Sequence, residues 1–315
     1  MINCSVFRVR GSKKPFIASL VLWALATLEI ACGGGSSSSS GSLPQTPPPA
    51  GQPTFSHIVL IVEENHNYSE VVGSSDMPYL NSLISQYGLA TRYFADAHPS
   101  MPNYLMLTTG QMETFDDNFT GTISDDNIVR ELVKAGKSWK AYEESIPAPA
   151  YLGPDQSPYV RRHDPFSYLS DVQNSATQAA NIVPFTQFAS DLAGNTLPQY
   201  AFVAPNVNDD AHNGTLAAAD SWLQNNVPAL LTNPAFQASG LLIITFDESE
   251  LIDLENGGGH VATVIISSQA KKGYQSQTMY QHQSLLRLLL TGSGVNSFPG
   301  LAGTAPDMTE FFTGH

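Results

Sequence analysis

The segment His98–Tyr104 (HPSMPNY) places a serine between two prolines, and two pairs of polar residues elsewhere each end an apolar run. These pairs are Glu64-Asn65 and Asp247-Glu248, and both offer hard oxygen ligands. A serine hydroxyl is a poor nucleophile unless a base or a metal ion lowers its pKa. The combination therefore indicates that Ser100 is a nucleophile activated by a metal ion.

Ser100 also suits a purely structural role at the start of a helix. A serine there caps backbone N–H groups, and Pro102 in the first turn costs no hydrogen bond. The same N–H groups and the helix dipole favour negative charge, so capping and nucleophilic attack are compatible. No Gly-x-Ser-x-Gly sequence occurs in the chain, which argues against the catalytic triad of the α/β-hydrolases.

The elements that must position these residues alternate between strands and helices. Continuous apolar strands such as 241–246 fit burial on both faces of a sheet. The alternation predicts an α/β fold, a three-layer α/β/α arrangement with a mostly parallel central sheet. Pro228 is expected to bend or break its helix. Strands are expected at 57–62, 138–142, 200–204, 241–246 and 262–266, and helices around 80–87, from Ser100 onward, and at 128–133, 222–231 and 284–290.

Three polar clusters fall where strands of this sheet end. They are the two pairs already named and the segment Asn206–His212, which follows the strand at 200–204. Ligands of open α/β sheets bind beyond the carboxyl ends of the strands. Any one cluster is explained as well by helix capping or by a polar loop, but the three together favour a single site.

The N-terminal residues have a different composition from the rest. Residues 1–31 combine a basic start with the apolar run Phe16–Ala26, which is typical of an export signal peptide and too short for a spanning helix. A small residue precedes Cys32, as in bacterial lipoproteins, although Glu29 departs from the usual residue at its position. We expect a lipid anchor on Cys32 and a cell-envelope location, with free secretion as the alternative. Residues 32–53 form a Gly/Ser/Pro-rich tether.

Charge and cysteine content exclude several functions. The net charge is −14, and residues 1–31 contribute four basic residues and one acidic residue, so the remaining chain carries −17. Nucleic acid is not expected as a partner, because its binding depends on Lys and Arg. Only Cys4 and Cys32 are present, so the body at 54–315 has no disulfide and no cysteine nucleophile. Its length suits one large catalytic domain.

The polar segments also match the motifs of a known family in the same order. The nucleophile segment, followed by Thr108-Thr109-Gly110, resembles that of the bacterial phosphoesterase family, which includes acid phosphatases and phospholipases C. This family belongs to the alkaline-phosphatase-like superfamily, and the resemblance spans residues 55–291. The other matching segments are Glu64-Asn65, Arg162–Phe166, Asp210-x-His212, Phe246–Glu248, Gly258–Val261 and Tyr280–Leu286.

The resemblance implies a role for each oxygen ligand. Ser100 corresponds to the residue that attacks phosphorus and forms a phosphoenzyme. One divalent metal ion is implied, and its ligands are Glu64, Asn65, Asp247 and Glu248. Oxygen ligands suit Mg²⁺, Mn²⁺, Ca²⁺ or Zn²⁺, so the identity of the metal stays open. The ion would lower the pKa of the serine and neutralise a phosphoryl oxygen.

The resemblance also implies roles for basic residues. His163, His212 and His260 are expected to be catalytic, by holding phosphate oxygens or protonating the leaving group. A second metal ion held by Asp210, His212 and His260 is an alternative. Four residues are expected to bind substrate, although Arg162 also suits a surface ion pair and His282 also suits a position behind the site. These four are His98, Arg162, Asp210 and His282.

The sequence therefore predicts a metal-dependent phosphoric ester hydrolase. The leading hypothesis is an acid-phosphatase-like phosphomonoesterase that acts on a small phosphomonoester through a phosphoserine intermediate. One alternative is a phospholipase C that cleaves a phospholipid phosphodiester. Another is a non-catalytic surface lipoprotein, although such a protein would not need Ser100 together with both polar pairs.

Overall fold

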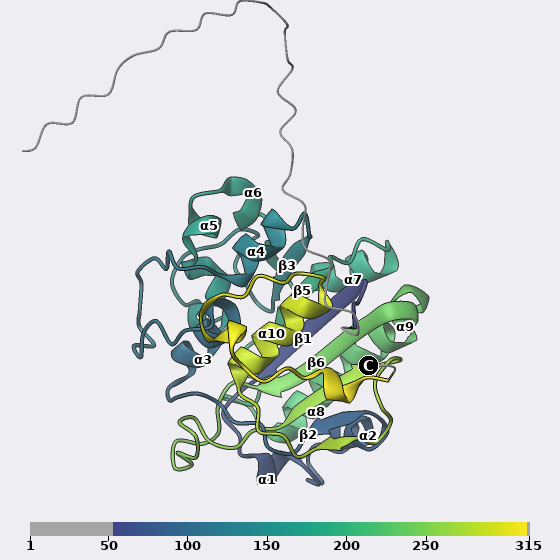
Figure 1. Cartoon of the computed structure of the whole chain (residues 1–315). Helices are drawn as coiled ribbons and strands as arrows, with labels where there is room; N and C mark the ends of the chain where they lie inside the picture. Colours follow the sequence, from purple (N-terminus) through teal and green to yellow (C-terminus); the bar gives the residue numbers. More distant parts are fainter. Residues whose placement is uncertain (1–52, 314–315) are drawn as a thin grey trace, which may run out of the picture. The chain divides into compact units, whose positions relative to one another are not determined.

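Strand β1 (His57–Glu63) lies at the centre of a sheet that has eight strands within residues 53–313, the range described by the computed structural model (Figure 1). The strand order is β4-β3-β5-β1-β6-β7-β2-β8. The other strands are β2 (Gly88–Ala90), β3 (Trp139–Glu143), β4 (Ile182–Pro184), β5 (Tyr200–Ala204), β6 (Gly240–Phe246), β7 (Thr263–Ser267) and β8 (Gln275–Ser276).

The sheet is mostly parallel, as predicted. Strand β1 pairs in parallel with both β5 and β6, whereas β7 runs antiparallel to its neighbours β6 and β2. The register places Glu63 opposite Phe246. The residues that follow them, Glu64 and Asp247, therefore leave the sheet side by side. The backbone N–H of Asp247 donates to the carbonyl of Glu63 at 3.0 Å.

Helices cover both faces of the sheet. On one face α10 (His282–Gly292) packs against α3 (Ser100–Thr109) and α4 (Ile128–Lys134), and Figure 1 shows α10 crossing in front of β1. A second group of helices consists of α2 (Pro78–Gln86), α8 (Leu216–Thr232) and α9 (Pro234–Ser239), in which α8 contacts both α2 and α9. The remaining helical elements are α1 (Tyr68–Val71), η1 (Arg161–His163), η2 (Pro165–Tyr168), α5 (Ser170–Gln173), α6 (Ala176–Ala179), α7 (Thr186–Ala193), η3 (Gly300–Gly303) and η4 (Thr309–Phe311).

The expectation that Pro228 could break its helix is wrong. Helix α8 continues beyond Pro228 to Thr232, whose hydroxyl donates to the Pro228 carbonyl at 2.8 Å. A proline inside a helix removes one N–H and leaves the carbonyl four residues earlier without its donor. That residue is Gln224, which is exposed, so water can satisfy its carbonyl.

The predicted signal peptide, the lipidation site at Cys32 and nearly all of the tether lie outside the described residues. Within residues 53–313, none of the helices is long and apolar enough to span a membrane.

Candidate active site

Ser100 is the first residue of α3 rather than its N-cap, which is Pro99. The expected capping role is therefore wrong, and the Ser100 side chain makes no cap hydrogen bond. The backbone N–H of Met101 donates instead to Asp117 Oδ1 at 3.1 Å, from a loop that follows the helix. This arrangement frees the Ser100 hydroxyl for other partners while an acidic side chain still stabilises the helix start.

The Ser100 hydroxyl points at the acids that follow β1 and β6. Its Oγ lies 3.2 Å from Glu64 Oε2 and 3.0 Å from Glu248 Oε1. All three side chains are buried, as is Asp247. Burial, followed by repulsion from Glu64 and Glu248, raises the pKa of Asp247 well above its usual range. Burial and Glu64 also raise the pKa of Glu248 to about 8. Three carboxylates thus lie close together in a buried site, and each disfavours the ionised form of the others.

Local backbone geometry turns the chain sharply into this site. Asn65 has φ +51°, a left-handed conformation that asparagine tolerates better than most residues. Its backbone N–H donates to Asp247 Oδ1 at 3.2 Å. Its side-chain amide contacts His212, with Nδ2 2.5 Å from His212 Nδ1. Asn65 therefore joins the acidic side of the site to its histidine side.

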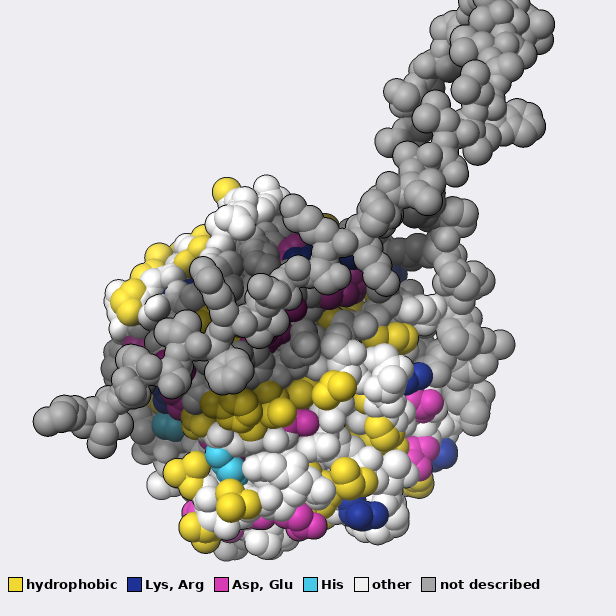
Figure 2. All heavy atoms as spheres, turned by 60° about the vertical axis from the view of Figure 1, so that its left-hand side comes forward, with side chains coloured by type: hydrophobic (Ala, Val, Ile, Leu, Met, Phe, Trp, Pro, Cys, Tyr) yellow, Lys and Arg dark blue, Asp and Glu magenta, His cyan; other side chains and the backbone are white. Residues whose placement is uncertain are grey.

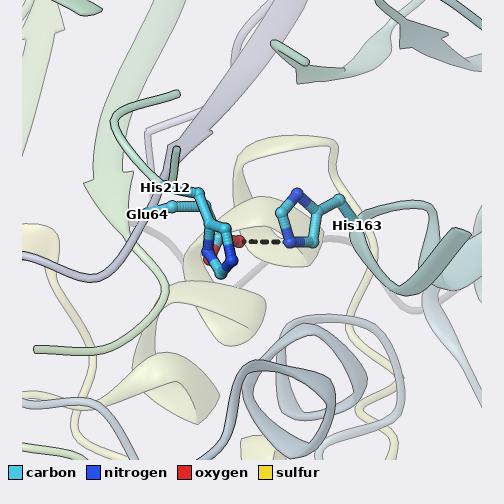
Figure 3. A group of neighbouring side chains, drawn as sticks. All are labelled: Glu64, His163 and His212. Atoms are coloured by element: carbon cyan, nitrogen blue, oxygen red, sulfur yellow. Dashed lines mark ion pairs between the residues drawn. The ribbon is translucent and has the colours of Figure 1, made fainter. Parts of the chain in front are cut away.

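His163 and His212 both approach the Glu64 carboxylate, and Figure 3 shows the ion pair between His163 and Glu64. His212 Nδ1 is 3.4 Å from Glu64 Oε2, and His163 Nε2 is 3.1 Å from Glu64 Oε1. The other ring nitrogen of His163, Nδ1, is 3.2 Å from Asp210 Oδ2. Neither of these two contacts of His163 has the geometry of a hydrogen bond. Burial lowers the pKa of His163 to about 4. The pKa of His212 is raised instead, chiefly because His212 hydrogen-bonds to Glu64.

The two histidines differ in access to solvent. The side chain of His212 is 25% exposed and that of His163 only 3%. Arg162 adds positive charge beside them, with one guanidinium nitrogen 3.4 Å from His212 Nε2 and another 3.7 Å from the Asp155 carboxylate. Asp210 supports the same loop, because its Oδ1 accepts from the His212 backbone N–H at 2.8 Å. Arg162, Asp210 and both histidines are therefore brought together.

Two further predicted histidines, His98 and His282, contact the acids that follow β6. His98 Nδ1 is bonded to Glu248 Oε2, and its Nε2 lies 2.9 Å from the Asp253 carbonyl oxygen. His282 is fully buried, with Nε2 2.6 Å from the Asp247 carbonyl and Nδ1 3.0 Å from the Tyr93 hydroxyl. The ring nitrogens of both residues are thus already occupied.

His260 lies against a different set of residues. Its Nε2 is 3.0 Å from the Thr91 carbonyl oxygen, and its ring stacks on Tyr68 with the centroids 4.1 Å apart. Its backbone N–H donates to Asp253 Oδ2 at 2.9 Å. These contacts join His260 to the edge of the site and do not include Ser100, Glu64 or Asp247.

The structure adds two residues that the sequence analysis missed, Tyr104 and Asp117. The Tyr104 hydroxyl donates to Glu64 Oε1, and its ring stacks on His163 with the centroids 5.1 Å apart. The spacing held a signal, because residues four apart on a helix lie on the same face and Tyr104 is four residues after Ser100. Asp117 offered no such signal, since a loop of unknown path separates it from α3.

We predict that Tyr104→Phe lowers kcat about 10- to 100-fold, because a hydrogen bond to a charged group contributes roughly 1.5–3 kcal/mol and this one orients Glu64. Steady-state kinetics with p-nitrophenyl phosphate would measure the change. Tyr200→Phe is the matched control, since Tyr200 is also buried and its hydroxyl has no hydrogen-bond partner. Equal activity of the two variants would contradict the role given to Tyr104.

The residues around Ser100 fit a divalent cation. Asp247 Oδ2 is buried and lacks a hydrogen-bond partner, and Glu64, Asp247 and Glu248 repel one another in a site closed to solvent. Carboxylates that face each other in this way are typical ligands of hard cations. A second candidate group consists of Glu64, His163 and His212, whose ligand atoms lie within 4.8 Å of one another. The two groups share Glu64.

Solved structures show the same fold. A protein of the alkaline phosphatase superfamily from Vibrio parahaemolyticus superposes with a TM-score of 0.55 at 12% identity, over 80% of this chain and 69% of its own. The phosphonate monoester hydrolase of Agrobacterium radiobacter superposes with a TM-score of 0.53 at 14% identity, over 82% of this chain and 77% of its own. The fold is therefore that of the alkaline phosphatase superfamily.

The family follows from sequence. A model of the phosphoesterase family matches residues 73–296, and the chain belongs to that family. A phosphatidylinositol-3-phosphatase of Mycobacterium tuberculosis is 30% identical over 92% of this chain and 94% of its own. A probable acid phosphatase of Kluyveromyces lactis is 33% identical over 74% of this chain, and an acid phosphatase of Aspergillus fumigatus 30% over 77%. The match covers only 56% of each of these two fungal proteins. The chain is thus a phosphoric ester hydrolase.

Proposed function

We propose that this chain is a phosphomonoesterase that depends on a divalent metal ion and uses Ser100 as its nucleophile. One observation carries the proposal: the Ser100 hydroxyl stands at a helix N-terminus, within 3.2 Å of two buried carboxylates from separate strand ends. A buried serine that only stabilised the fold would not need two acids as partners. The names of the relatives, acid phosphatases and a phosphoinositide phosphatase, support monoester hydrolysis.

The reaction that we propose has two steps. Ser100 Oγ forms a bond to phosphorus as the bond from phosphorus to the ester oxygen breaks, which leaves phosphoserine and an alcohol. Water then attacks phosphorus, and the bond from phosphorus to Ser100 Oγ breaks to release phosphate. The N-terminus of α3 favours the negative charge that both steps place beside it.

Glu64, Asp247 and Glu248 are the residues that we propose hold the metal ion. When bound, a divalent cation supplies the charge that lowers the pKa of a serine hydroxyl and neutralises phosphoryl oxygens. In this structure the amide of Asn65 faces His212, so we assign Asn65 to orienting that histidine, while its backbone N–H orients Asp247. The identity of the ion stays among Mg²⁺, Mn²⁺, Ca²⁺ and Zn²⁺.

The basic residues divide into those that reach substrate and those that support the site. We assign His212 as the proton donor to the leaving group, because it is the more exposed of the two histidines beside Glu64. Arg162, next to it, would bind phosphoryl oxygens. His163 is buried and orients Glu64. His98 and His282 have occupied ring nitrogens and position Glu248 and Asp247.

A comparison of two chromogenic substrates tests this proposal. The purified protein should release nitrophenol from p-nitrophenyl phosphate when a divalent cation is present and should lose that activity in EDTA. Activity on p-nitrophenylphosphorylcholine instead would favour a phospholipase C. Failure with both substrates and every divalent cation would support a non-catalytic surface protein.

We also propose that the chain is exported and anchored through a lipid on Cys32. The basic start, the apolar run and the cysteine before the tether support this proposal. Mass spectrometry of the N-terminal peptide from cells would test it, because an unmodified N-terminus at a different residue would indicate free secretion.

A further inference from the structure

A loop after β6 holds three large aliphatic side chains in water. Leu251 is 70% exposed, Ile252 85% and Leu254 68%. Isolated exposed apolar residues are common on protein surfaces, but three within four positions form a group. The loop, at residues 250–259, projects as a green segment from the lower left of the molecule in Figure 1.

Hydrogen bonds hold this loop in its path. The Ser249 hydroxyl donates to the Gly258 carbonyl at 3.0 Å and so closes the base of the loop. Within it, the Asp253 carboxylate accepts from the backbone N–H groups of Glu255 and His260, at 3.0 and 2.9 Å. The apolar side chains are therefore presented outward by an ordered backbone.

The loop is also linked to the nucleophile through two side chains, His98 and Glu248. The Asp253 carbonyl oxygen lies 2.9 Å from His98 Nε2, and the other ring nitrogen of His98 is bonded to Glu248. Glu248 in turn lies 3.0 Å from the Ser100 hydroxyl. One imidazole and one carboxylate thus separate the apolar loop from the attacking oxygen.

A second loop contacts the start of α3 through Asp117. Phe115 is 60% exposed and lies two residues before Asp117, which is bonded to the start of α3. The described part of the chain has seven large exposed hydrophobic side chains, and four of them lie on these two loops. Figure 2, which brings the left-hand side of Figure 1 forward, shows hydrophobic side chains gathered in patches on this face. Four of the seven exposed side chains therefore lie on loops that are bonded to residues around Ser100.

We propose that these two loops insert into a lipid surface and that the phosphate ester hydrolysed at Ser100 is carried by a lipid in that surface. The inference rests on the proposed function and adds the physical state of the substrate. Side chains that stand out from the protein suit insertion among acyl chains, because transfer of aliphatic surface from water to hydrocarbon is favourable.

Charge identifies the kind of surface. Residues 110–126 and 250–259 contain no Lys or Arg and several Asp and Glu, so electrostatic attraction to anionic lipids is excluded as the source of binding. The surface that fits is neutral or zwitterionic, with the phosphate ester as a minor component. A lipid on Cys32 would keep the protein at such a surface through the tether.

The test uses residues 33–315, which contain every helix and strand described above and lack Cys32. The variant Leu251→Ser/Ile252→Ser/Leu254→Ser is compared with Leu301→Ser, which changes a leucine that is 51% exposed and near the C-terminal end of α3. Binding to phosphatidylcholine vesicles is measured by flotation. Activity is measured on p-nitrophenyl phosphate and on phosphatidic acid held at low content in the same vesicles.

We expect the triple variant to bind vesicles about tenfold more weakly or worse, and to lose activity on vesicle phosphatidic acid by a similar factor. Its activity on p-nitrophenyl phosphate should match that of Leu301→Ser. Phe115→Ser should weaken vesicle binding independently, and high salt should not. Normal p-nitrophenyl phosphate turnover without vesicle binding by the wild-type protein would overturn the inference and leave the proposed function standing. Absence of all turnover would instead overturn the proposed function.

A monomeric ester separates surface insertion from recognition of the leaving group. Short-chain phosphatidic acid below its micelle concentration should be hydrolysed equally by wild type and the triple variant. A loss of activity on that monomer equal to the loss on vesicles would show that the loops bind the substrate itself, and would overturn the assignment to a lipid surface.

Discussion

Ser100→Ala is expected to lower kcat on p-nitrophenyl phosphate by a factor of about 10⁴ or more, because no other hydroxyl takes its place and nucleophile removal in hydrolases has effects of this size. Ser100 is 2% exposed, and alanine fits the same space without a clash. The fold should therefore survive, with the α3 N-terminus still bonded to Asp117. Far-ultraviolet circular dichroism and a urea unfolding curve would establish this.

A serine at the same helix position elsewhere provides the control. Ser170 is the first residue of α5, as Ser100 is of α3, and its replacement by alanine should leave kcat unchanged. Acid quenching during turnover of a ³²P-labelled substrate should trap phosphate on Ser100 in the wild type and none in Ser100→Ala. Near-normal turnover by Ser100→Ala, or label on another residue, would refute the assignment.

Metal removal is expected to have the second largest effect, and its effect on stability should depend on pH. Burial and mutual repulsion raise the pKa of Asp247 well above its usual range and that of Glu248 from 4.5 to about 8. Between about pH 4.5 and 8 the folded protein without metal therefore binds more protons than the unfolded chain. Its free energy of unfolding should fall as pH rises through this window, by an amount on the order of a few kcal/mol.

A bound divalent cation should reverse this trend, because it replaces the protons between the carboxylates. In EDTA the Tm should be about 10 °C lower at pH 8 than with the cation, and nearly equal at pH 5. Differential scanning calorimetry with and without Mg²⁺, Mn²⁺, Ca²⁺ or Zn²⁺ would measure the Tm at both pH values.

The variant Asp247→Asn tests the cause of this effect. It removes one of the repelling charges and keeps an oxygen for the Asn65 backbone N–H. In EDTA at pH 8 the variant should be more stable than the wild type, but addition of any of the four cations should raise its Tm only slightly. A wild type whose Tm at pH 8 responded to none of the four ions would contradict the metal site.

The parallel centre of the fold was predictable from local pattern alone. Strands such as β6 are continuous apolar runs, and such runs are buried on both faces whatever the remainder of the chain does. The short edge strands were not predicted. Strand β8 has only two residues, and β4 has three, so their pairing depends on neighbours distant in sequence rather than on their own composition.

Pro228 illustrates the same limit in a helix. Local propensity predicts a break, but packing of α8 against α2 and α9 outweighs the loss of one hydrogen bond. Asp220 strengthens that packing, because its two carboxylate oxygens accept from the backbone N–H groups of Tyr79 and Leu80 at the start of α2. No pattern within α8 reveals such a contact.

The sequence by itself identified the candidate side chains for the proposed chemistry. Ser100, Glu64 and the pair Asp247-Glu248 are recognisable because a nucleophile followed by proline and acids at strand ends are local features. Their convergence follows from parallel strands, whose carboxyl ends meet at one edge. The structure brings Ser100, Glu64 and Glu248 together as that rule requires.

Only the tertiary structure decided what each polar residue faces. His212 and His98 are both histidines near acids in sequence, yet one is partly exposed beside Arg162 and the other is enclosed between Glu248 and Asp253. Side-chain direction and solvent access depend on contacts between segments far apart in the chain. Residue type and spacing record what a group can do, whereas three-dimensional packing determines which partner it meets.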